Sequence, residues 1–442
     1  MSSTYQETIE FLYNQTPQFQ QIGAAAYKPG LATVTRLANR FGNPQQSLRM
    51  IHVAGTNGKG STAHSIASVL QSAGYKVGLF TSPHLLDFRE RIKINGEMIS
   101  HDAVTAFVDR FKEISQTGSE DFHPSFFELT TVMAFDWFAQ NKVDYAVIEV
   151  GLGGRLDSTN IINSILSVIT NISFDHIAQL GNSLASIASE KGGIMKTSID
   201  CVVGEAVGDV KEVFEKRAND VGCQLYFADE ILPAENLCRG DVAIEAETPF
   251  GKVNYGLTGF CQEKNLQTIL TALSRLRAAG VEFADSAVIE GLREVVTKTG
   301  LSGRWMTLSD KPIIVCDTGH NEGGWQYLSH QLDSHCGPLV MILGFVNDKD
   351  ISHILPLVPE RAEIIYTRAS VPRALSETRL AEIGCAAGRC GMTAPSVKEA
   401  LEMARKRAEQ LSMDCRNEES PLIFVGGSTF VVADLLAIEN LK

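Results

Sequence analysis

The chain has 442 residues, and its 39 lysines and arginines against 52 aspartates and glutamates give a formal net charge of −13. Proteins that hold the phosphate backbone of nucleic acids usually carry a basic surplus, so this charge argues against nucleic-acid binding. Hydrophobic residues make up 44% of the chain and charged residues 21%; these globular values exclude disorder as the main state and, at this length, predict about two to three domains.

The sequence contains no uninterrupted apolar run of the roughly 20 residues that a membrane-spanning helix needs, and its start lacks a basic segment followed by an apolar one. We therefore expect a cytoplasmic protein without membrane contacts, and the lack of heptads favours a monomer. No two cysteines form a C-x-x-C pair, so we expect reduced thiols and no structural zinc site. The cysteines are Cys201, Cys223, Cys238, Cys261, Cys316, Cys336, Cys385, Cys390 and Cys415.

Apolar runs typical of strands alternate with helical patterns over most of the sequence, which indicates parallel βαβ units. In the first half the expected strands are 49–54, 76–80, 143–150 and 165–172. A polar or glycine-rich cluster follows each of them. Because ligands of open α/β sheets bind beyond the carboxyl ends of the strands, these clusters are candidate site segments.

The strand and helix pattern weakens at residues 205–256, where short strands and turns are expected, and residues 297–303 read as a turn-rich linker. The pattern then restarts, with strands expected at 312–316, 339–343, 363–366 and 422–425 and helical segments at 374–387 and 397–411. We predict an α/β protein with a large P-loop-type ATPase domain and a mainly parallel sheet at 1–296. A smaller Rossmann-like α/β domain is predicted at 304–442.

A glycine-rich loop with one lysine, Gly55-Thr56-Asn57-Gly58-Lys59-Gly60, joins the first expected strand to a helix expected to begin at Ser61. The N–H groups of such a loop and of the helix N-terminus attract an anion, and Lys59 would reach the β- and γ-phosphates of a nucleotide. The loop departs from G-x-x-x-x-G-K-[ST], because two residues separate the glycines and Gly60 stands where a metal-binding hydroxyl should follow the lysine. A plain turn between strand and helix is the alternative.

A magnesium ion for the nucleotide would therefore take its hydroxyl ligand from another residue, either Ser61 or Thr81 and Ser82 at the end of the next strand. Glu149 is the candidate acidic ligand. It ends an apolar strand, where a buried carboxylate is costly unless a cation compensates it.

A competing class is the nucleotide-binding switch protein, because Asn141-Lys142-Val143-Asp144 matches the N-K-x-D pattern that reads guanine. A guanine-reading loop must follow the carboxyl end of a strand, on the edge that carries the phosphate loop. This tetrapeptide instead precedes the strand that ends at Glu149, so we expect it at the opposite edge of the sheet.

Three motifs together resemble the folylpolyglutamate synthases and bifunctional dihydrofolate synthases of the Mur ligase superfamily. They are Gly55 to Ser61, Thr81-Ser82-Pro83-His84 and the Glu149 to Asp157 stretch E-V-G-L-G-G-R-L-D, and the resemblance continues from about residue 20 to the C-terminus. It implies a ligase that transfers the γ-phosphoryl of ATP to a carboxylate of dihydropteroate or of a folate. The amine of L-glutamate then attacks the acyl phosphate and phosphate leaves. The motif forms favour both activities in one enzyme.

The resemblance also implies roles for single residues. Lys59 would hold the phosphates, and Lys191 would be carbamylated, which turns a cation into an anion able to hold a second magnesium ion. Gly192 stands where the family usually has alanine, and without the resemblance Lys191 would be read as a solvated helix lysine. A lone His176 would likewise be read as a surface histidine. The implied Mg²⁺ ligands are Ser82, Glu149 and His176.

ATP contacts are implied in both domains. Gly259, Gln262 and Asn265 match the family's G-x-x-Q-x-x-N, and Ser302-Gly303-Arg304 stands for its P-G-R, with serine replacing proline. Asp317-Thr318-Gly319-His320-Asn321 resembles D-x-A-H-N, which implies that His320 acts with Lys59 and Lys191 in catalysis. The implied ATP-binding residues are Asn57, Gly58, Lys59, Gly60, Ser61, Asn265, Arg304 and Asp317.

The pterin side of the substrate is expected at two segments, because aromatic rings stack on a flat heterocycle and a carboxylate accepts hydrogen bonds from its ring nitrogens. The candidate residues are Ser125, Phe126, Phe127, Glu128, Leu156, Asp157 and Ser158. For the two phenylalanines, ordinary core packing is the alternative. Arg89 and Arg91 could attract the anionic substrate or form a solvated hairpin edge.

The expected partners are thus ATP, L-glutamate, Mg²⁺ and either dihydropteroate or a reduced folate. A peptidoglycan precursor ligase, which adds an amino acid to a UDP-sugar peptide, is the rival within the same superfamily. The form Gly58-Lys59-Gly60-Ser61 followed by Thr81-Ser82-Pro83-His84 favours the folate enzymes.

Overall fold

The computed structural model describes residues 3–14, 30–116, 122–347, 349–414 and 420–439. Its contacts divide the chain into two compact units. Unit 1 comprises Met1–Thr258 and Gln262–Leu301, and unit 2 comprises Gly259–Cys261 and Ser302–Lys442. The main boundary falls after Leu301, within the predicted linker, and helix α13 (Val295–Thr299) occupies the first part of that segment.

The main sheet in the described part of unit 1 has eight strands in the order β4-β3-β2-β5-β1-β6-β7-β8. Their bounds are β1 Met50–Ala54, β2 Val77–Phe80, β3 Ile92–Ile94, β4 Glu97–Met98, β5 Tyr145–Glu149, β6 Ser164–Ile169, β7 Cys201–Val203 and β8 Leu225–Phe227. Neighbours from β2 to β8 are parallel, and the β3 and β4 edge is antiparallel. The predicted α/β class with a mainly parallel sheet is confirmed.

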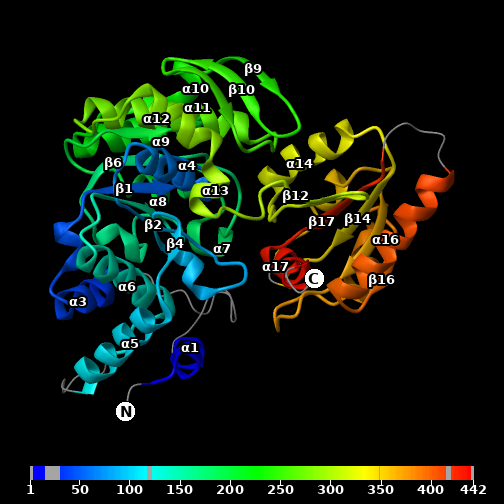
Figure 1. Cartoon of the computed structure of the whole chain (residues 1–442), viewed down its shortest axis with the longest axis horizontal. Helices are drawn as coiled ribbons and strands as arrows, with labels where there is room; N and C mark the ends of the chain where they lie inside the picture. The colour runs from blue at the N-terminus through cyan, green and yellow to red at the C-terminus, as the bar shows by residue number, and fades with distance from the viewer. Residues whose placement is uncertain (1–2, 15–29, 117–121, 348, 415–419, 440–442) are drawn as a thin grey trace. The chain divides into compact units, whose positions relative to one another are not determined.

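Helices cover both faces of this sheet, which explains why its central strands are apolar at nearly every position. Ile51 and Val53 belong to one apolar core with helices α4, α11 and α12, whereas Met50 belongs to another core with α3, α5 and α6. Figure 1 shows these two groups of helices on opposite sides of the sheet. The helices are α1 Tyr5–Asn14, α3 Ala32–Arg40, α4 Lys59–Ser72, α5 His101–Gln116, α6 Phe126–Gln140, α7 Ile177–Leu180, α8 Leu184–Gly192, α9 Asp209–Val221, α10 Ala228–Ile231, α11 Gln262–Ala278 and α12 Asp285–Arg293. Short 3₁₀ turns lie at Pro44–Ser47 (η2), Phe88–Arg91 (η3) and Ser158–Ile161 (η4).

The register of the central strands brings three of their ends together. Val53 of β1 pairs with Glu149 of β5 and with Val168 of β6. The glycine loop, the Glu149–Gly154 segment and the residues after Ile169 therefore leave the sheet at one edge. Asn141 is the C-cap residue of α6, and strand β5 begins only at Tyr145. The N-K-x-D tetrapeptide therefore lies at the end of β5 opposite to Glu149 and the phosphate loop, as predicted.

A three-stranded antiparallel sheet occupies part of the region in which the sequence pattern weakens. Its order is β11-β10-β9, with β9 Glu235–Arg239, β10 Ile244–Thr248 and β11 Gly251–Tyr255. One face of it, including Ile244, Val253 and Tyr255, joins the core of α4 and α11. Alternating buried and exposed positions of this kind give short strands a weak sequence signal.

Unit 2 contains a six-stranded sheet in the order β12-β13-β17-β14-β15-β16 within its described residues. All neighbours are parallel except the edge strand β12. The strands are β12 Met306–Asp310, β13 Ile313–Cys316, β14 Leu339–Leu343, β15 Glu363–Thr367, β16 Met392–Ala394 and β17 Leu422–Gly426. The helices are α14 Glu322–Ser334, η5 Leu355–Leu357, α15 Glu377–Ala386, α16 Val397–Asp414 and α17 Thr429–Glu439. This confirms a second, smaller α/β unit.

The prediction that all cysteines are reduced is wrong for Cys385 and Cys390, which form a disulfide. The chain turns back through Gly388 between the end of α15 and β16, and the two Cα atoms lie 4.2 Å apart. A search for C-x-x-C spacing misses a pair that a turn brings together. The other described cysteines are not disulfide-bonded, and Cys415 lies outside the described residues. No helix in the described part of the chain has the length and apolar character of a membrane span.

Candidate functional site

The glycine loop between β1 and α4 is a tight turn in which two positions require glycine. Gly55 has a φ of 142° and Gly58 a φ of 82°, and a Cβ atom would collide with the hydroxyl of Thr170 at Gly55 and with the side chain of Asn265 at Gly58. Thr170 also binds the loop directly, because its hydroxyl donates to the carbonyl oxygen of Asn57 at 2.5 Å. The plain-turn alternative does not explain such close packing.

The segment after β6 holds the loop in place. Thr56 N–H donates to the carbonyl of Asn171 at 2.9 Å, and Asn57 N–H donates to the side-chain oxygen of Asn171 at 2.9 Å. The side-chain amide of Asn57 donates to the hydroxyl of Ser173 at 3.1 Å. The predicted nucleotide residue Asn57 is therefore fixed by residues that sequence reasoning did not assign, and only their position after a strand signalled them.

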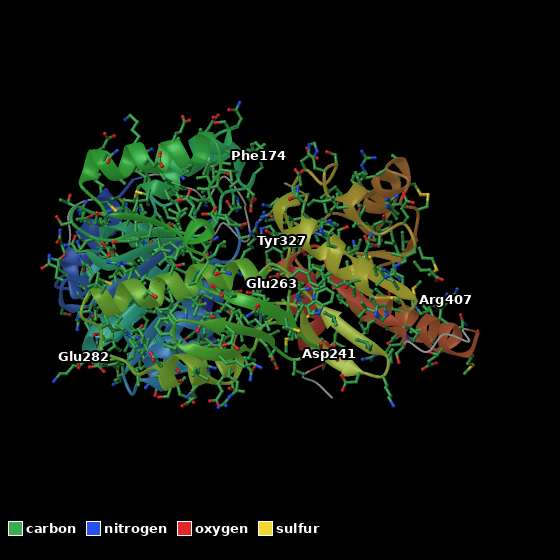
Figure 2. All side chains as sticks on the ribbon, turned by 90° about the horizontal axis from the view of Figure 1, so that it is seen from above. Phe174, Asp241, Glu263, Glu282, Tyr327 and Arg407 are labelled. Atoms are coloured by element: carbon green, nitrogen blue, oxygen red, sulfur yellow. A yellow bond between two sulfur atoms is a disulfide. The ribbon has the colours of Figure 1, made fainter. Side chains whose placement is uncertain are left out.

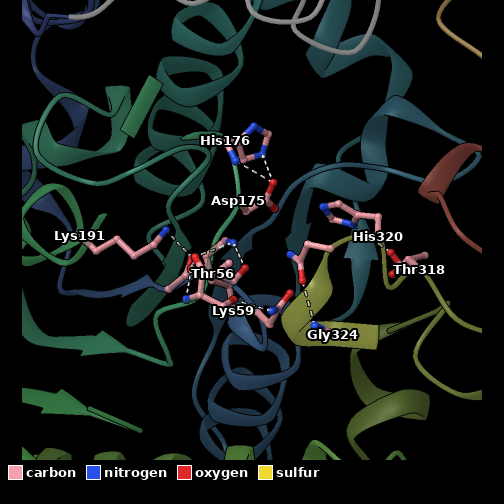
Figure 3. Close-up of polar contacts among 12 residues, drawn as sticks. Thr56, Lys59, Asp175, His176, Lys191, Thr318, His320 and Gly324 are labelled. Carbon is pink, nitrogen blue, oxygen red and sulfur yellow. Dashed lines mark hydrogen bonds and ion pairs between the residues drawn. The ribbon is translucent and has the colours of Figure 1, made fainter. Parts of the chain in front are cut away.

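Two lysine ammonium groups meet at one backbone carbonyl of this loop. Lys59 Nζ donates to the carbonyl oxygens of Gly55 and Thr56, both at 3.0 Å, and Lys191 Nζ donates to that of Gly55 at 2.8 Å (Figure 3). Lys191 is 4% exposed, so the solvated-helix alternative is wrong. Burial, reinforced by the charge of Lys59, lowers the pKa of Lys191 to about 7, while Asp175 acts in the opposite direction.

The other predicted ATP residues of unit 1 lie beside the loop. Gln262, at the start of α11, donates through its side-chain amide to the hydroxyl of Ser61 at 3.2 Å. Asn265, one turn later, donates to Gln262 Oε1 at 2.8 Å and faces Gly58. All three side chains are buried. The N-terminus of α4 and that of α11 thus meet at the phosphate loop, so Ser61 and Asn265 belong to one cluster.

Two of the three predicted metal ligands lie together at the ends of neighbouring strands. Ser82 N–H donates to Glu149 Oε2 at 3.2 Å, and Glu149 is 3% exposed. A hydroxyl and a carboxylate are hard oxygen donors of the kind that Mg²⁺ prefers. Among the described residues no group of three or more His, Cys, Asp or Glu side chains forms a complete metal site. A cation here would therefore share its coordination with phosphate and water, as magnesium usually does.

His176 is the N-cap residue of α7, and its ring lies beside the carboxylate of the preceding residue. Asp175 Oδ1 accepts the His176 backbone N–H at 2.8 Å and lies 3.8 Å from His176 Nε2 (Figure 3). The charge of Asp175 also raises the pKa of Lys191, so this carboxylate acts on the lysine pair as well as on the histidine. Phe174 precedes it with 46% of its surface exposed (Figure 2). The sequence analysis assigned no role to Asp175.

Two predicted pterin residues form a helix cap. Ser125 is the N-cap of α6, its hydroxyl accepts the Glu128 N–H at 3.3 Å, and Glu128 Oε2 accepts the Ser125 N–H at 2.7 Å. This reciprocal pair is a capping box. It fixes the start of α6 and hence the place of the two phenylalanines.

The aromatic pair has one buried and one partly exposed member. Phe126 packs against Phe88 with ring centroids 5.8 Å apart, so the core-packing alternative holds for it. Phe127 lies against Gly151, where a Cβ atom would collide with its ring, and 5.8 Å from the ring of Phe80. Phe127 thus lies between the strand ends of β2 and β5.

The remaining predicted pterin residues surround a buried carboxylate. Asp157 accepts from the backbone N–H groups of Thr159 at 3.0 Å and Leu152 at 2.8 Å, and from the Thr159 hydroxyl at 2.5 Å. Burial raises its pKa against these hydrogen bonds. Thr159 Oγ1 lies 2.8 Å from Nε2 of the buried His52 on β1. Leu156 and Ser158, which flank Asp157, are partly exposed.

The buried His52 predicts a pH dependence of stability. Burial, with a contribution from Lys196, lowers its pKa to about 3, whereas in the unfolded chain it is near 6.5. Between these values the unfolded chain binds the proton and the folded one does not, so the free energy of unfolding falls as pH falls below about 6.5. The expected slope from His52 is about 1.4 kcal/mol per pH unit.

Urea unfolding at pH 7, 6 and 5 measures this slope in the wild type, in His52→Gln and in the control His123→Gln, which changes an exposed histidine. We expect His52→Gln to lose stability at pH 7 and to show a shallower decline toward pH 5. The control should retain the wild-type decline. An unchanged slope in His52→Gln would rule out His52 as the source.

Three predicted site residues belong to unit 2 and lie on or beside the loop that follows β13: Arg304, Asp317 and His320. Asp317 is partly buried, and its two oxygens accept the N–H groups of Trp305 and Gly319, both at 2.7 Å. Burial raises its pKa, and Arg304 opposes this. The guanidinium of Arg304 donates to the Thr318 hydroxyl, and His320 Nδ1 lies 3.0 Å from the Thr318 carbonyl (Figure 3). The candidate residues therefore form two groups, one in each unit.

Comparisons with known proteins agree with this geometry. A model of the Mur ligase middle domain matches residues 53–230. The dihydrofolate synthase/folylpolyglutamate synthase of Bacillus subtilis is 36% identical over 358 residues, which cover 77% of this chain and 80% of that protein. A probable bifunctional folylpolyglutamate synthase/dihydropteroate synthase of Haloferax volcanii is 31% identical over 97% of this chain, and the chain spans 50% of its length.

Solved structures are similar over the whole length. FolC of Escherichia coli in complex with DHPP and ADP has a TM-score of 0.82 and 28% identity, covering 100% of this chain and 98% of that one. The bifunctional folylpolyglutamate synthase/dihydrofolate synthase of Yersinia pestis, complexed with AMPPNP and Mn, has a TM-score of 0.81 and 27% identity, covering 99% and 98%.

Proposed function

The chain belongs to the folylpolyglutamate synthase and dihydrofolate synthase family of ATP-dependent ligases, and we propose that it joins L-glutamate both to dihydropteroate and to the γ-carboxyl of reduced folates. The observation that carries the proposal is the common strand edge, where the Lys59 and Lys191 ammonium groups meet at Gly55 and the Ser82–Glu149 pair lies at the ends of β2 and β5. Such an edge combines a phosphate cradle with a metal-binding carboxylate. We expect the enzyme to work as a monomer in the cytoplasm.

The chemistry explains the need for these groups. A carboxylate does not react with an amine at neutral pH, so its oxygen first takes the γ-phosphoryl group from ATP and ADP leaves. The amine of glutamate then attacks the carbonyl carbon, the amide forms and inorganic phosphate departs. Phosphoryl transfer depends mainly on positioning and charge neutralisation. Lys59, the loop N–H groups and the N-terminus of α4 supply these, and the contacts of Thr170 and Asn171 hold the loop rigid.

We assign Mg²⁺ as the metal, which would supply positive charge to neutralise the phosphates. Its proposed ligands are Ser82, Glu149 and His176, and the observations that support these three assignments differ. The backbone N–H of Ser82 donates to the Glu149 carboxylate, which brings these two residues together, whereas His176 lies beside Asp175. Manganese accompanies the nucleotide analogue in the Yersinia pestis structure, which supports a divalent cation in this family.

On the nucleotide side we further propose contacts from Asn265, Arg304 and Asp317, with His320 close to the reacting groups. The backbone N–H groups that bind Asp317 fix its carboxylate, and Thr318 orients both Arg304 and His320. On the pterin side we propose that Phe127 stacks on the heterocycle and that Asp157 binds it. The cap formed by Ser125 and Glu128 positions Phe126 and Phe127, and Leu156 and Ser158 complete the pterin site.

Lys191 is proposed to carry a carbamate, since carbon dioxide adds only to a neutral amine. With a pKa of about 7, a large fraction of Lys191 is neutral at physiological pH, and this fraction rises as pH passes through 7. We expect phosphate release by the wild type to fall when bicarbonate and carbon dioxide are removed, and to recover when bicarbonate is restored.

Lys191→Gln should lower the rate of phosphate release at least about 10-fold, comparable to the loss of a charged group that contacts the transferred phosphoryl. Its remaining rate should not depend on bicarbonate. Lys196→Gln is the matched control, because Lys196 is a partly buried lysine that donates to Asn160 O at 3.1 Å away from the loop. A wild-type rate that is indifferent to bicarbonate, with no ¹³C carbamate signal after ¹³CO₂ labelling, would remove the carbamate from the mechanism.

The function is tested by phosphate release from MgATP with L-glutamate and one of three acceptors: dihydropteroate, tetrahydrofolate or a UDP-muramoyl peptide. We expect turnover with the first two. Turnover with tetrahydrofolate alone would remove dihydrofolate synthesis from the proposal. Turnover with the UDP-muramoyl peptide alone would replace the folate assignment by a peptidoglycan precursor ligase.

A further inference from the structure

The two arginines of the 3₁₀ turn η3, which the sequence left undecided, have different environments. Arg89 is held by Asp87 through contacts of 2.7 to 3.1 Å, and its side chain is 20% exposed. Arg91 is 3% exposed. The solvated-edge alternative is therefore wrong for Arg91, and Arg89 is a surface ion pair.

The buried guanidinium of Arg91 packs against one of the proposed pterin residues. Its central carbon lies 5.2 Å from the centroid of the Phe126 ring, which gives it an aromatic face. The carbonyl of Arg91 accepts the N–H of Thr81 at 3.0 Å, directly before Ser82. Burial lowers the pKa of Arg91 to about 10, and the charge of Glu149 acts in the opposite direction. A permanent cation is thus buried between the pterin residues and the metal-binding edge.

A histidine orients this cation through a defined tautomer. Arg91 Nε–H donates to His84 Nδ1 at 2.7 Å, so Nδ1 carries no proton and the ring proton is on Nε2. His84 Nε2 lies 3.4 Å from the hydroxyl of Tyr13, and the two rings are parallel within 11°. The neutral imidazole therefore connects helix α1 to Arg91.

The loop that carries His84 and Arg91 is itself held by a carboxylate. Glu90 accepts the backbone N–H groups of Leu85, Leu86 and Asp87 at 2.7, 2.9 and 2.8 Å. Its two oxygens thus organise the turn between His84 and Arg91. The guanidinium is a planar fork suited to a carboxylate, and here its direction is set before a ligand arrives.

We propose that Arg91 binds the carboxylate of the pteroyl substrate that accepts the phosphoryl group, and that His84, supported by Tyr13, is the residue that positions it. The ligand class is an anion whose reacting carboxylate lies on a chain that ends in a flat heterocycle. Phe126 covers one face of the guanidinium, and the metal-binding edge lies next to it. The proposal rests on the proposed function, because it names the group that holds the acceptor in that reaction.

The first test measures binding of dihydropteroate and tetrahydrofolate, and of ATP, to the wild type, Arg91→Met, Arg91→Lys and the control Arg89→Met. Loss of a charged hydrogen-bond partner is expected to weaken pteroyl binding by about 10- to 100-fold in Arg91→Met. Arg91→Lys should recover part of it. ATP affinity should stay within about twofold in all variants, as should pteroyl affinity in Arg89→Met. Wild-type pteroyl affinity in Arg91→Met would overturn the proposal.

The second test separates positioning from direct contact. His84→Asn keeps an acceptor near the position of Nδ1 and should retain most of the affinity, whereas His84→Leu removes it and should raise the KM for the pteroyl substrate without changing that for ATP. The double variant His84→Leu/Arg91→Met should bind no more weakly than Arg91→Met alone, because the histidine acts through the arginine. Additive losses in the double variant would contradict the positioning role.

The two proposals fail in different ways. If the wild type binds neither pteroyl compound but turns over a UDP-muramoyl peptide, the proposed function falls and the role of Arg91 falls with it. If the wild type binds pteroyl substrates and Arg91→Met binds them equally well, the function stands and only the role of Arg91 is removed. Thermal unfolding of each variant identifies misfolding, and Arg91→Lys carries the test if Arg91→Met does not fold.

Discussion

Lys59→Met is expected to lower ATP-dependent phosphate release by about 10²- to 10³-fold, because it removes the cation at the phosphate loop while keeping the apolar stem of the side chain. In the folded chain this ammonium already lies 3.0 Å from the carbonyls of Gly55 and Thr56. The loop backbone remains pinned by Asn171, so the fold should persist. Steady-state phosphate release with saturating glutamate and dihydropteroate measures the effect.

Lys264→Met is the control for this variant. Lys264 lies on α11 of the same unit and pairs with Glu205 near the surface, so its loss should leave the rate within about twofold. Thermal unfolding should show both variants folded. A near-normal rate in Lys59→Met would remove this lysine from the reaction and would require another cation at the phosphates.

Glu149→Gln is expected to lower phosphate release by a similar factor of about 10²- to 10³-fold and to raise the Mg²⁺ concentration needed for half-maximal rate. The amide has the size of the carboxylate, so the packing at the end of β5 is kept, and its oxygen still accepts the Ser82 N–H. The variant loses the charge that balances a cation. Excess Mg²⁺ should restore part of the rate in Glu149→Gln and none in Lys59→Met.

The control is Asp144→Asn, at the other end of the same sheet strand. Asp144 accepts the Lys76 N–H at 2.7 Å and lies at the edge opposite to the phosphate loop. We expect its Mg²⁺ dependence to match the wild type. If Glu149→Gln shows the wild-type Mg²⁺ dependence, Glu149 does not bind the metal.

The sequence predicted the parts of the fold that bury apolar strands on both faces. The strands β1, β5 and β6 and the loop before α4 stand out, because parallel strands between two helical layers are apolar at successive positions. The edge strands β3 and β4 have three and two residues and carry no such pattern. Strand β12 was missed for a related reason, since none of its positions is fully buried and its partly buried and exposed positions do not alternate regularly.

The site was predicted less completely, because its contacts join distant parts of the chain. Asn57 meets Asn171 and Ser173, more than a hundred residues away, and no local pattern marks such a meeting. Ser125 and Glu128 show what a local pattern can give. Their S-x-x-E spacing is the signature of a helix cap, and their hydrogen bonds form that cap, whereas their predicted contact with the pterin stays a prediction.

The carbonyl of Gly55, which accepts from both Lys59 and Lys191, makes nucleotide and carbon dioxide thermodynamically linked ligands under the proposed carbamate. Adding carbon dioxide to Lys191 withdraws one donor from that carbonyl and reverses the charge beside Lys59. If the carbamate changes the affinity for ATP by some factor, bound ATP must change the affinity for carbon dioxide by the same factor. Through this six-residue loop, ATP binding and carbamylation of Lys191 would depend on each other. The concentration of dissolved carbon dioxide would then affect how readily the ligase binds ATP.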